Sequence, residues 1–151
     1  MNRAVAINGP VTVEPRSESL HRLFFTFTEP ITQIGGITLR DQDSNPIGHA
    51  TYQVQPDPRV VRLTLSDIPD ASRVRITLVD VNGTQDFSVS MGFLIGDVTS
   101  NGSVTAADQL VTRARTGPVT SHNFRSDVNL NGSVDSIDRT IVRVRSGRRL
   151  P

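Results

Sequence analysis

Two stretches of the chain place oxygen-bearing side chains at regular intervals around a glycine. In residues 97–108, such side chains stand at positions one, three, five, nine and twelve, and glycine is sixth. Residues 127–138 repeat this pattern. Ca²⁺ takes about 6–8 oxygen ligands, so a short loop must wrap around it and turn sharply near its middle. Glycine is favoured at such a turn. The spacing therefore predicts two Ca²⁺ sites.

The two loops belong to an internal repeat with a period of 127 − 97 = 30 residues. The identities in register are Asp97/Asp127, Val98/Val128, Asn101/Asn131, Gly102/Gly132, Ser103/Ser133, Val104/Val134, Asp108/Asp138, Arg113/Arg143, Arg115/Arg145 and Gly117/Gly147. So many matches indicate a duplication. The eighth residue of each loop is apolar, Val104 or Val134, and is expected to pack into a core.

Short helical patterns follow both loops. They predict helices over residues 108–115 and 138–145, which glycines at 117 and 147 end. In the first helix, Leu110, Val111 and Ala114 are expected to form the apolar face. Phe124, which lies between the repeats, is expected to anchor the core.

Residues 96–147 resemble a type I dockerin module. In that family, two calcium loops are each followed by one helix and are closed by aspartate. Here Gly96-Asp97-Val98 and Ser126-Asp127-Val128 open the loops, and Asp108 and Asp138 close them. The resemblance implies that the first site uses Asp97, Thr99, Asn101, the Ser103 carbonyl, Thr105 through water, and Asp108. It implies that the second uses Asp127, Asn129, Asn131, the Ser133 carbonyl, Asp135 and Asp138.

The two predicted sites are unequal in charge. The second loop holds three aspartates at ligand positions and the first holds two. Fewer ligand charges weaken calcium binding, so the second site is expected to fill first.

The resemblance also implies a protein partner. Dockerins bind cohesin domains and thereby attach enzymes, often polysaccharide-degrading ones, to a scaffold or a cell surface. Family recognition commonly involves a Ser-Thr pair at loop positions ten and eleven, with basic residues along the helix. The corresponding residues here are Ala106, Ala107, Ser136 and Ile137, with Arg113, Arg115, Arg143 and Arg145. The first four depart from the Ser-Thr pair and differ between the repeats, while the arginines persist.

Residues 1–95 carry a β pattern. Short runs rich in Val, Ile, Leu, Thr and Phe alternate with turn residues, which predicts strands near residues 4–7, 11–14, 23–28, 36–39, 50–55, 60–65, 73–80 and 87–93. Val74, Ile76 and Leu78 are expected to face inward, whereas the strand at 23–28 is expected to be buried on both faces. The count indicates an antiparallel sandwich of immunoglobulin-like type, loosely similar to modules of bacterial extracellular proteins. We therefore expect a β domain at 1–95 and a small helical domain with two calcium loops at 96–151.

Composition narrows the possible functions. The net charge is +1 and cysteine is absent, which argues against nucleic-acid binding and excludes a thiolate metal site. No apolar run is long enough for a membrane span. No residues are spaced as a catalytic set, so we expect no enzyme activity.

The favoured interpretation is a monomeric, extracellular docking module at the C-terminal part of a larger secreted protein. The alternatives are a calcium-stabilised structural spacer without a partner, and carbohydrate binding by the β domain. Six Phe, one Tyr and no Trp weigh against a sugar-stacking surface.

Overall fold

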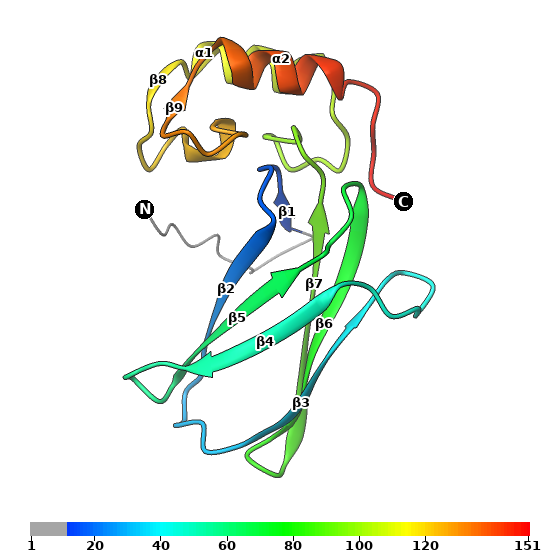
Figure 1. Cartoon of the computed structure of the whole chain (residues 1–151), viewed down its shortest axis with the longest axis vertical. Coiled ribbons are helices and arrows are strands. Elements are labelled where there is room, and N and C mark those ends of the chain that lie inside the picture. Colours follow the sequence, from blue (N-terminus) through cyan, green and yellow to red (C-terminus); the bar gives the residue numbers. More distant parts are fainter. Residues whose placement is uncertain (1–11) are drawn as a thin grey trace. The chain divides into compact units, whose positions relative to one another are not determined.

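The computed structural model describes residues 12–151, in which seven β-strands precede a region with two short α-helices (Figure 1). The predicted strand at 4–7 and residue 11 lie outside the described residues. The other predicted strands are confirmed within two or three residues at their ends. Residues 19–68 and 74–90 form one compact unit. Residues 12–18, 69–73 and 91–151 belong to the other.

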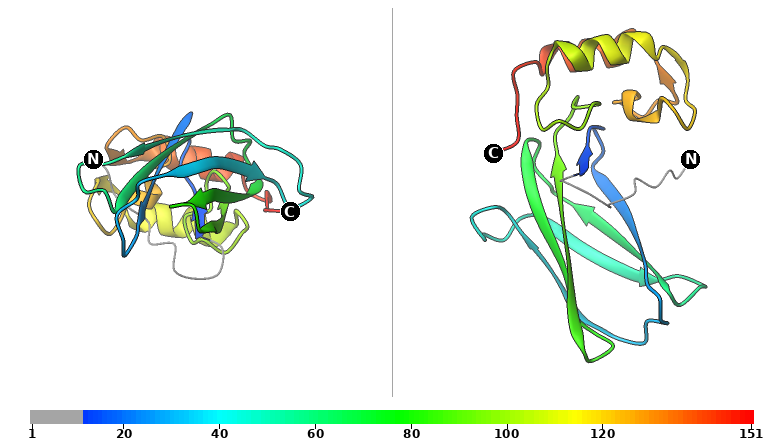
Figure 2. Two further views of the ribbon diagram at one scale, coloured as in Figure 1. Left: turned by 90° about the horizontal axis from the view of Figure 1, so that it is seen from below. Right: turned by 180° about the vertical axis from the view of Figure 1, so that it is seen from behind.

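The strands form two larger sheets, which Figure 2 shows from two further sides. The first sheet has the order β1 (Thr12–Glu14), β7 (Gln85–Phe93), β6 (Ser72–Val81) and β3 (Ile34–Arg40). Its β1 and β7 run parallel, and its β3 and β6 run antiparallel. The second sheet has β2 (Leu20–Thr26), β5 (Val60–Ser66) and β4 (His49–Val54), all antiparallel to their neighbours. The chain is thus mostly β before the helices begin.

Alternating burial in β5 and β6 builds the core of the first unit. Val61, Leu63 and Leu65 of β5 are fully buried. In β6, the predicted inward residues 74, 76 and 78 are confirmed, since each is at most 1% exposed. Phe27 and Phe87 meet edge to face with ring centroids 5.1 Å apart, which joins β7 to the segment after β2.

The strand β2 corrects one expectation. Phe24 is 39% exposed and its neighbours alternate, so this strand is buried on one face and not on both. Leu23, Phe24 and Phe25 are consecutive apolar residues, which hid the alternation.

The β6–β7 turn agrees with its sequence, since Asn82 and Gly83 both have positive φ, at 55° and 70°. That pair of conformations is the tight hairpin turn that Asn-Gly favours.

The second unit contains α1 (Ala106–Ala114) and α2 (Ser136–Val144), with β8 (Gly117–Pro118), the 3₁₀ helix η1 (Phe124–Ser126) and β9 (Ser133–Val134) between them. Each α-helix begins two residues before its predicted start. Thr105 and Asp135 cap these starts, each accepting from a backbone N–H with its side chain. Each also forms a capping box with the aspartate three residues later.

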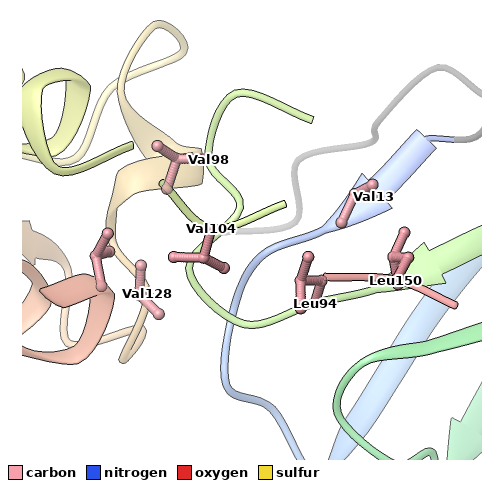
Figure 3. Close-up of a cluster of buried hydrophobic side chains, with 7 residues drawn as sticks. Val13, Leu94, Val98, Val104, Val128 and Leu150 are labelled. Atoms are coloured by element: carbon pink, nitrogen blue, oxygen red, sulfur yellow. The ribbon is translucent and has the colours of Figure 1, made fainter. Parts of the chain in front are cut away.

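An apolar cluster organises the second unit (Figure 3). It contains Val13, Leu94, Val98, Val104, Val128, Val142 and Leu150. Val104 and Val134 are fully buried, as predicted for the eighth loop residue. These branched side chains pack the loops against the helices, and Val111 and Ile141 of the helices are partly buried against them.

Two packing predictions for this unit need correction. Val111 packs against the apolar cluster as predicted. Leu110 is 66% exposed and Ala114 is also exposed, because α1 buries Asp108 and Thr112 instead. The loop carboxylate therefore decides which face of the helix turns inward. Phe124 is only half-buried and lies outside the apolar cluster, with the Arg16 guanidinium 5.7 Å from its ring centroid.

We expect Leu63→Ala to lower the free energy of unfolding by about 2–5 kcal/mol, because it leaves a cavity at a fully buried position. The matched control is Thr64→Ala, the next residue on the other face of β5, with an expected loss below about 1 kcal/mol. Urea unfolding followed by circular dichroism measures both. Equal losses for the two variants would contradict the assigned burial.

Candidate metal centre

Both loops have the same backbone conformation at their turns. The fourth residues, Ser100 and Leu130, have φ of 59° and 61°. The sixth, Gly102 and Gly132, have φ of 83° and 91°. Positive φ at the sixth position confirms the sharp turn that the glycine predicts there, because a residue with a Cβ is strained in this conformation.

The first aspartate of each loop accepts hydrogen bonds from the turn. Asp97 Oδ1 accepts from the Asn101 N–H at 3.1 Å, and its Oδ2 accepts from the Gly102 N–H at 2.8 Å. Asp127 repeats the arrangement, with Oδ1 3.1 Å from Asn131 N and Oδ2 3.0 Å from Gly132 N. The loops therefore close around their first residue in the same way.

The twelfth residue ties the start of each loop to its end. Asp108 Oδ1 accepts from the Thr99 N–H and hydroxyl at 3.0 and 2.9 Å, while Oδ2 accepts from the Thr105 N–H at 2.8 Å.

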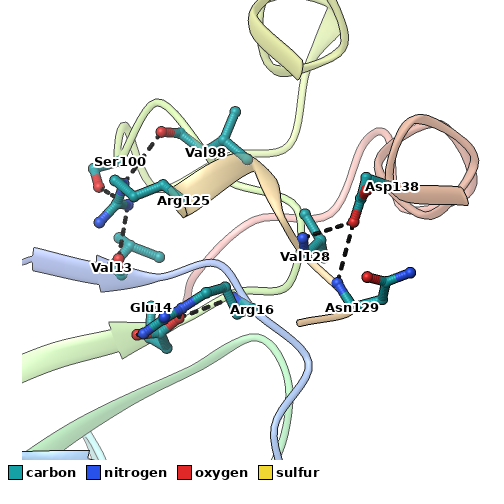
Figure 4. Close-up of polar contacts among 9 residues, drawn as sticks. All are labelled: Val13, Glu14, Arg16, Val98, Ser100, Arg125, Val128, Asn129 and Asp138. Atoms are coloured by element: carbon teal, nitrogen blue, oxygen red, sulfur yellow. Dashed lines mark hydrogen bonds and ion pairs between the residues drawn. The ribbon is translucent and has the colours of Figure 1, made fainter. Parts of the chain in front are cut away.

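In the second loop, Asp138 Oδ1 accepts from the N–H groups of Val128 and Asn129, at 2.8 and 3.2 Å (Figure 4). Its Oδ2 accepts from the Asp135 N–H at 2.8 Å.

One contact of the first loop has no counterpart in the second, because the second loop has Asn129 in place of Thr99. The Thr99 hydroxyl also lies 3.3 Å from Asp97 Oδ1. Thr99 thus bridges the two acids of the first loop.

Four carboxylates are buried in the two loops. Asp97, Asp108 and Asp138 are 0% exposed and Asp127 is 4% exposed. Burial raises the pKa of Asp97, and the charge of Asp108 raises it further against the N–H donors at Gly102 and Asn101. Burial likewise raises the pKa of Asp127, with Asp138 adding to the effect. Each loop thus holds two desolvated acids that repel one another, a donor set that suits a hard cation.

The other predicted ligands lie at the rims of the loops. Asn101 and Asn131 each accept from the N–H of the serine two residues on, both at 2.9 Å. Asp135 accepts from the Ile137 N–H at 2.7 Å and from Asn131 Nδ2 at 3.3 Å. Within residues 12–151, no three acidic or histidine side chains meet at one point. Hydroxyl, amide and carbonyl oxygens must therefore complete any cation shell built on the aspartate pairs.

Neighbouring segments hold the loops, and sequence reasoning missed them. Arg125 donates to the carbonyls of Val98 and Val13 at 3.3 and 2.8 Å, and also to the Ser100 hydroxyl (Figure 4). Its burial lowers its pKa. The Ser17 N–H donates to the Val128 carbonyl at 2.7 Å. The residues before β2 thus contact both loops, a link that no side-chain spacing could have indicated.

The predicted docking residues lie on the two helices, except Arg115 and Arg145, which directly follow them. Those that are exposed are Ala106, Ala107, Arg113, Arg115, Ser136, Ile137 and Arg143. Arg145 differs, because its Nε lies 3.4 Å from Asp70 Oδ2 and its side chain is 29% exposed. It is therefore engaged within the unit, unlike the other three predicted arginines.

A groove of about 360 Å³ separates the exposed sides of α1 and α2. It is lined by Gln109, Leu110, Arg113, Ser136, Arg139, Thr140 and Arg143. Three arginines and no acidic residue line it, so it presents positive charge. Leu110, Ile137 and Val144 add exposed apolar surface on the two helices, at 66%, 54% and 73%.

Residues 95–145 match the family model described as dockerin type I domain. The match spans about a third of the chain and supports a calcium-dependent protein–protein docking module, in a family that binds calcium and cohesin domains. A search of curated proteins and a search of solved structures each gave no match. Among the described residues, no helix is long and apolar enough to cross a membrane.

The sixth position offers a direct test of loop conformation. A Cβ added at Gly132 would meet no atom within 4 Å, so any cost of substitution comes from the backbone. We expect Gly132→Ala to destabilise the second unit, measured in excess Ca²⁺, by about 1–2 kcal/mol. Gly132→Asn should cost less, because asparagine tolerates positive φ. Thermal unfolding followed by helical circular dichroism would contradict this reasoning if Asn were as costly as Ala.

Proposed function

We propose that residues 96–151 are a calcium-loaded docking module that attaches a larger secreted protein to a cohesin-like partner. The observation that carries the proposal is the repeated pair of buried aspartates, Asp97 with Asp108 and Asp127 with Asp138. Two unneutralised acids buried close together are costly, and a divalent cation offsets that cost. The match of residues 95–145 to the dockerin model supports the same interpretation.

Each loop is proposed to hold one Ca²⁺ through its aspartate pair. The hydroxyl of Thr99 or the amide of Asn129, and the carbonyls of Ser103 and Ser133, would supply further oxygens. Asn101, Asn131, Thr105 and Asp135 would complete the shells, the last two while they cap the helices. Because α1 and α2 bury little apolar surface, calcium binding would supply part of their folding free energy.

The partner is proposed to bind the exposed helix face around the groove. Arg113, Arg139 and Arg143 line the groove, and Leu110 and Ile137 supply exposed apolar surface. Such a face suits a protein surface that combines acidic and apolar residues. The two repeats differ at Ala106-Ala107 and Ser136-Ile137, so the two halves of the face offer different contacts.

The β region is proposed to be an immunoglobulin-like sandwich at residues 1–95. The two antiparallel-rich sheets with alternating burial support it. We infer no catalytic role for it, because the sequence does not space residues as an acid–base or nucleophile set. The protein is proposed to be monomeric and extracellular, which fits calcium-dependent attachment to a partner.

Calorimetric titration with Ca²⁺ should show two sites of unequal affinity, with the second loop tighter because it carries a third aspartate. Asp127→Asn should remove the tighter step and Asp97→Asn the weaker one. Equal affinities, or a tighter first loop, would contradict the charge argument. Absence of any binding would overturn the proposed function.

Immobilised cohesin domains should capture the chain in calcium and release it in chelator. Arg113→Glu with Arg143→Glu should weaken capture at least about tenfold, because two charges would oppose the partner. Arg22→Glu, at an exposed position of β2, is the matched control and should leave capture unchanged. Calcium binding without capture of any cohesin domain would favour the structural spacer.

A further inference from the structure

The two loops use different segments as backbone partners. The second loop pairs with β8, where Gly117 faces Val134 and Pro118 faces Ser133. The Val119 N–H then donates to the Gly132 carbonyl at 3.0 Å. This partner segment lies between the two loops and inside the region matched by the family model.

The first loop pairs with residues 147–150, which follow α2 and lie beyond the matched region. Ser103 and Arg149 form an antiparallel bridge. The Gly147 N–H donates to the Val104 carbonyl at 2.8 Å, and the Val104 N–H donates to the Arg148 carbonyl at 2.8 Å. The Leu150 N–H donates to the Gly102 carbonyl at 2.9 Å. The partner of the first loop therefore comes from the far end of the repeat.

This pairing sets the direction of the Ser103 peptide groups. Its neighbours Gly102 and Val104 make the hydrogen bonds to residues 147–150, so Ser103 occupies the non-hydrogen-bonded place of the bridge. The N–H and C=O of such a residue point away from the partner segment. The Ser103 N–H accordingly donates to Asn101 Oδ1 at 2.9 Å, on the side of the loop. The Ser103 carbonyl, a proposed Ca²⁺ ligand, faces the same side.

Leu150 anchors this segment. It is 7% exposed and belongs to the apolar cluster with Val13 and Leu94 (Figure 3). Its Cδ1 occupies the space beside Gly92 where a side chain would otherwise stand. A glycine at that position therefore makes room for the leucine.

An ion pair holds the same segment from its other end. Arg148 Nη1 lies 2.8 Å from Asp70 Oδ2, and Arg145 Nε lies 3.4 Å from the same atom. Asp70 is itself fixed, because its Oδ1 accepts from the N–H groups of Ala71 and Ile95 at 3.0 and 2.8 Å. Residues 147–150 are thus held by an apolar and an ionic contact.

We propose that Leu150 is a positioning residue for calcium in the first loop, and that Asp70 supports it through Arg148. The inference rests on the proposed function, since it requires that the first loop binds Ca²⁺. Residues 147–150 orient the Ser103 carbonyl, and β8 does the same for Ser133 in the second loop. The two sites should therefore respond separately to changes in their partner segments.

The test is a Ca²⁺ titration of isotope-labelled full chain, followed by the amide signals of Gly102 and Gly132. These report the two loops individually, because each N–H donates to the first aspartate of its loop. Leu150→Ala should weaken calcium binding by the first loop about 10–100-fold, the usual effect of losing a supporting contact. The second loop should stay within about twofold, because it has its own partner segment.

Three further variants distinguish a positioning role of Leu150 from a general loss of stability. Leu150→Met, which preserves apolar volume, should restore binding by the first loop. Asp70→Asn, which removes the ion pair with little change of shape, should weaken the first loop alone. Val119→Ala, the matched control beside the second loop, should leave the first loop within about twofold.

The outcomes separate the two proposals. If Leu150→Ala weakens both loops equally, or neither, while the unsubstituted chain binds two Ca²⁺, the positioning role is overturned and the proposed function stands. If Met at position 150 fails to restore the first loop, the positioning role is also overturned. If the unsubstituted chain binds no Ca²⁺, the proposed function fails and this inference fails with it.

Discussion

The structure of the second unit depends on burying two carboxylates side by side in each loop. Asp97 and Asp108, like Asp127 and Asp138, are removed from water and accept hydrogen bonds from the surrounding backbone N–H groups. Those hydrogen bonds fix the loop shape, and they offset only part of the desolvation and like-charge repulsion. The helices start at these loops, and α1 turns its Asp108 face inward at the expense of Leu110. A cation at each pair would remove the remaining electrostatic penalty.

The apolar contribution to this unit is small and is gathered from distant parts of the chain. Val98, Val104, Val128 and Val142 come from the repeat, whereas Val13 and Leu150 lie far from it or at its end. Polar contacts follow the same pattern, since Arg125 binds the Val13 carbonyl and Arg148 pairs with Asp70. The repeat therefore supplies the loops and helices, and flanking segments supply the surfaces against which they pack. A boundary between the domains near residue 95 stays a prediction, because residues 12–18 and 69–73 cluster with the helical region.

The loop turns and the buried strand faces could be predicted from the sequence, because the residue types at those positions favour one conformation or one environment. The glycines at positions 102 and 132 predict a sharp turn in each loop, and both have positive φ. The alternation of Val74, Ile76 and Leu78 indicates a strand that buries one face. Leu110 was assigned to the wrong face because helical periodicity counts apolar residues and ignores a buried acid. The pairing of residues 147–150 with the first loop could not be predicted, since it consists of backbone hydrogen bonds. Asp70 gave no signal either, because the arginines with which it pairs, Arg145 and Arg148, lie more than seventy residues away along the chain.

If cations at the aspartate pairs stabilise α1 and α2, hydrogen exchange of the intact chain should differ between excess Ca²⁺ and chelator. We expect the amides of residues 106–114 and 136–144 to exchange at least about tenfold faster in chelator, as local stability is lost. Amides of β5 and β6 in the first unit should exchange at the same rate in both conditions. Unchanged protection of both helices in chelator would show that a cation does not stabilise them.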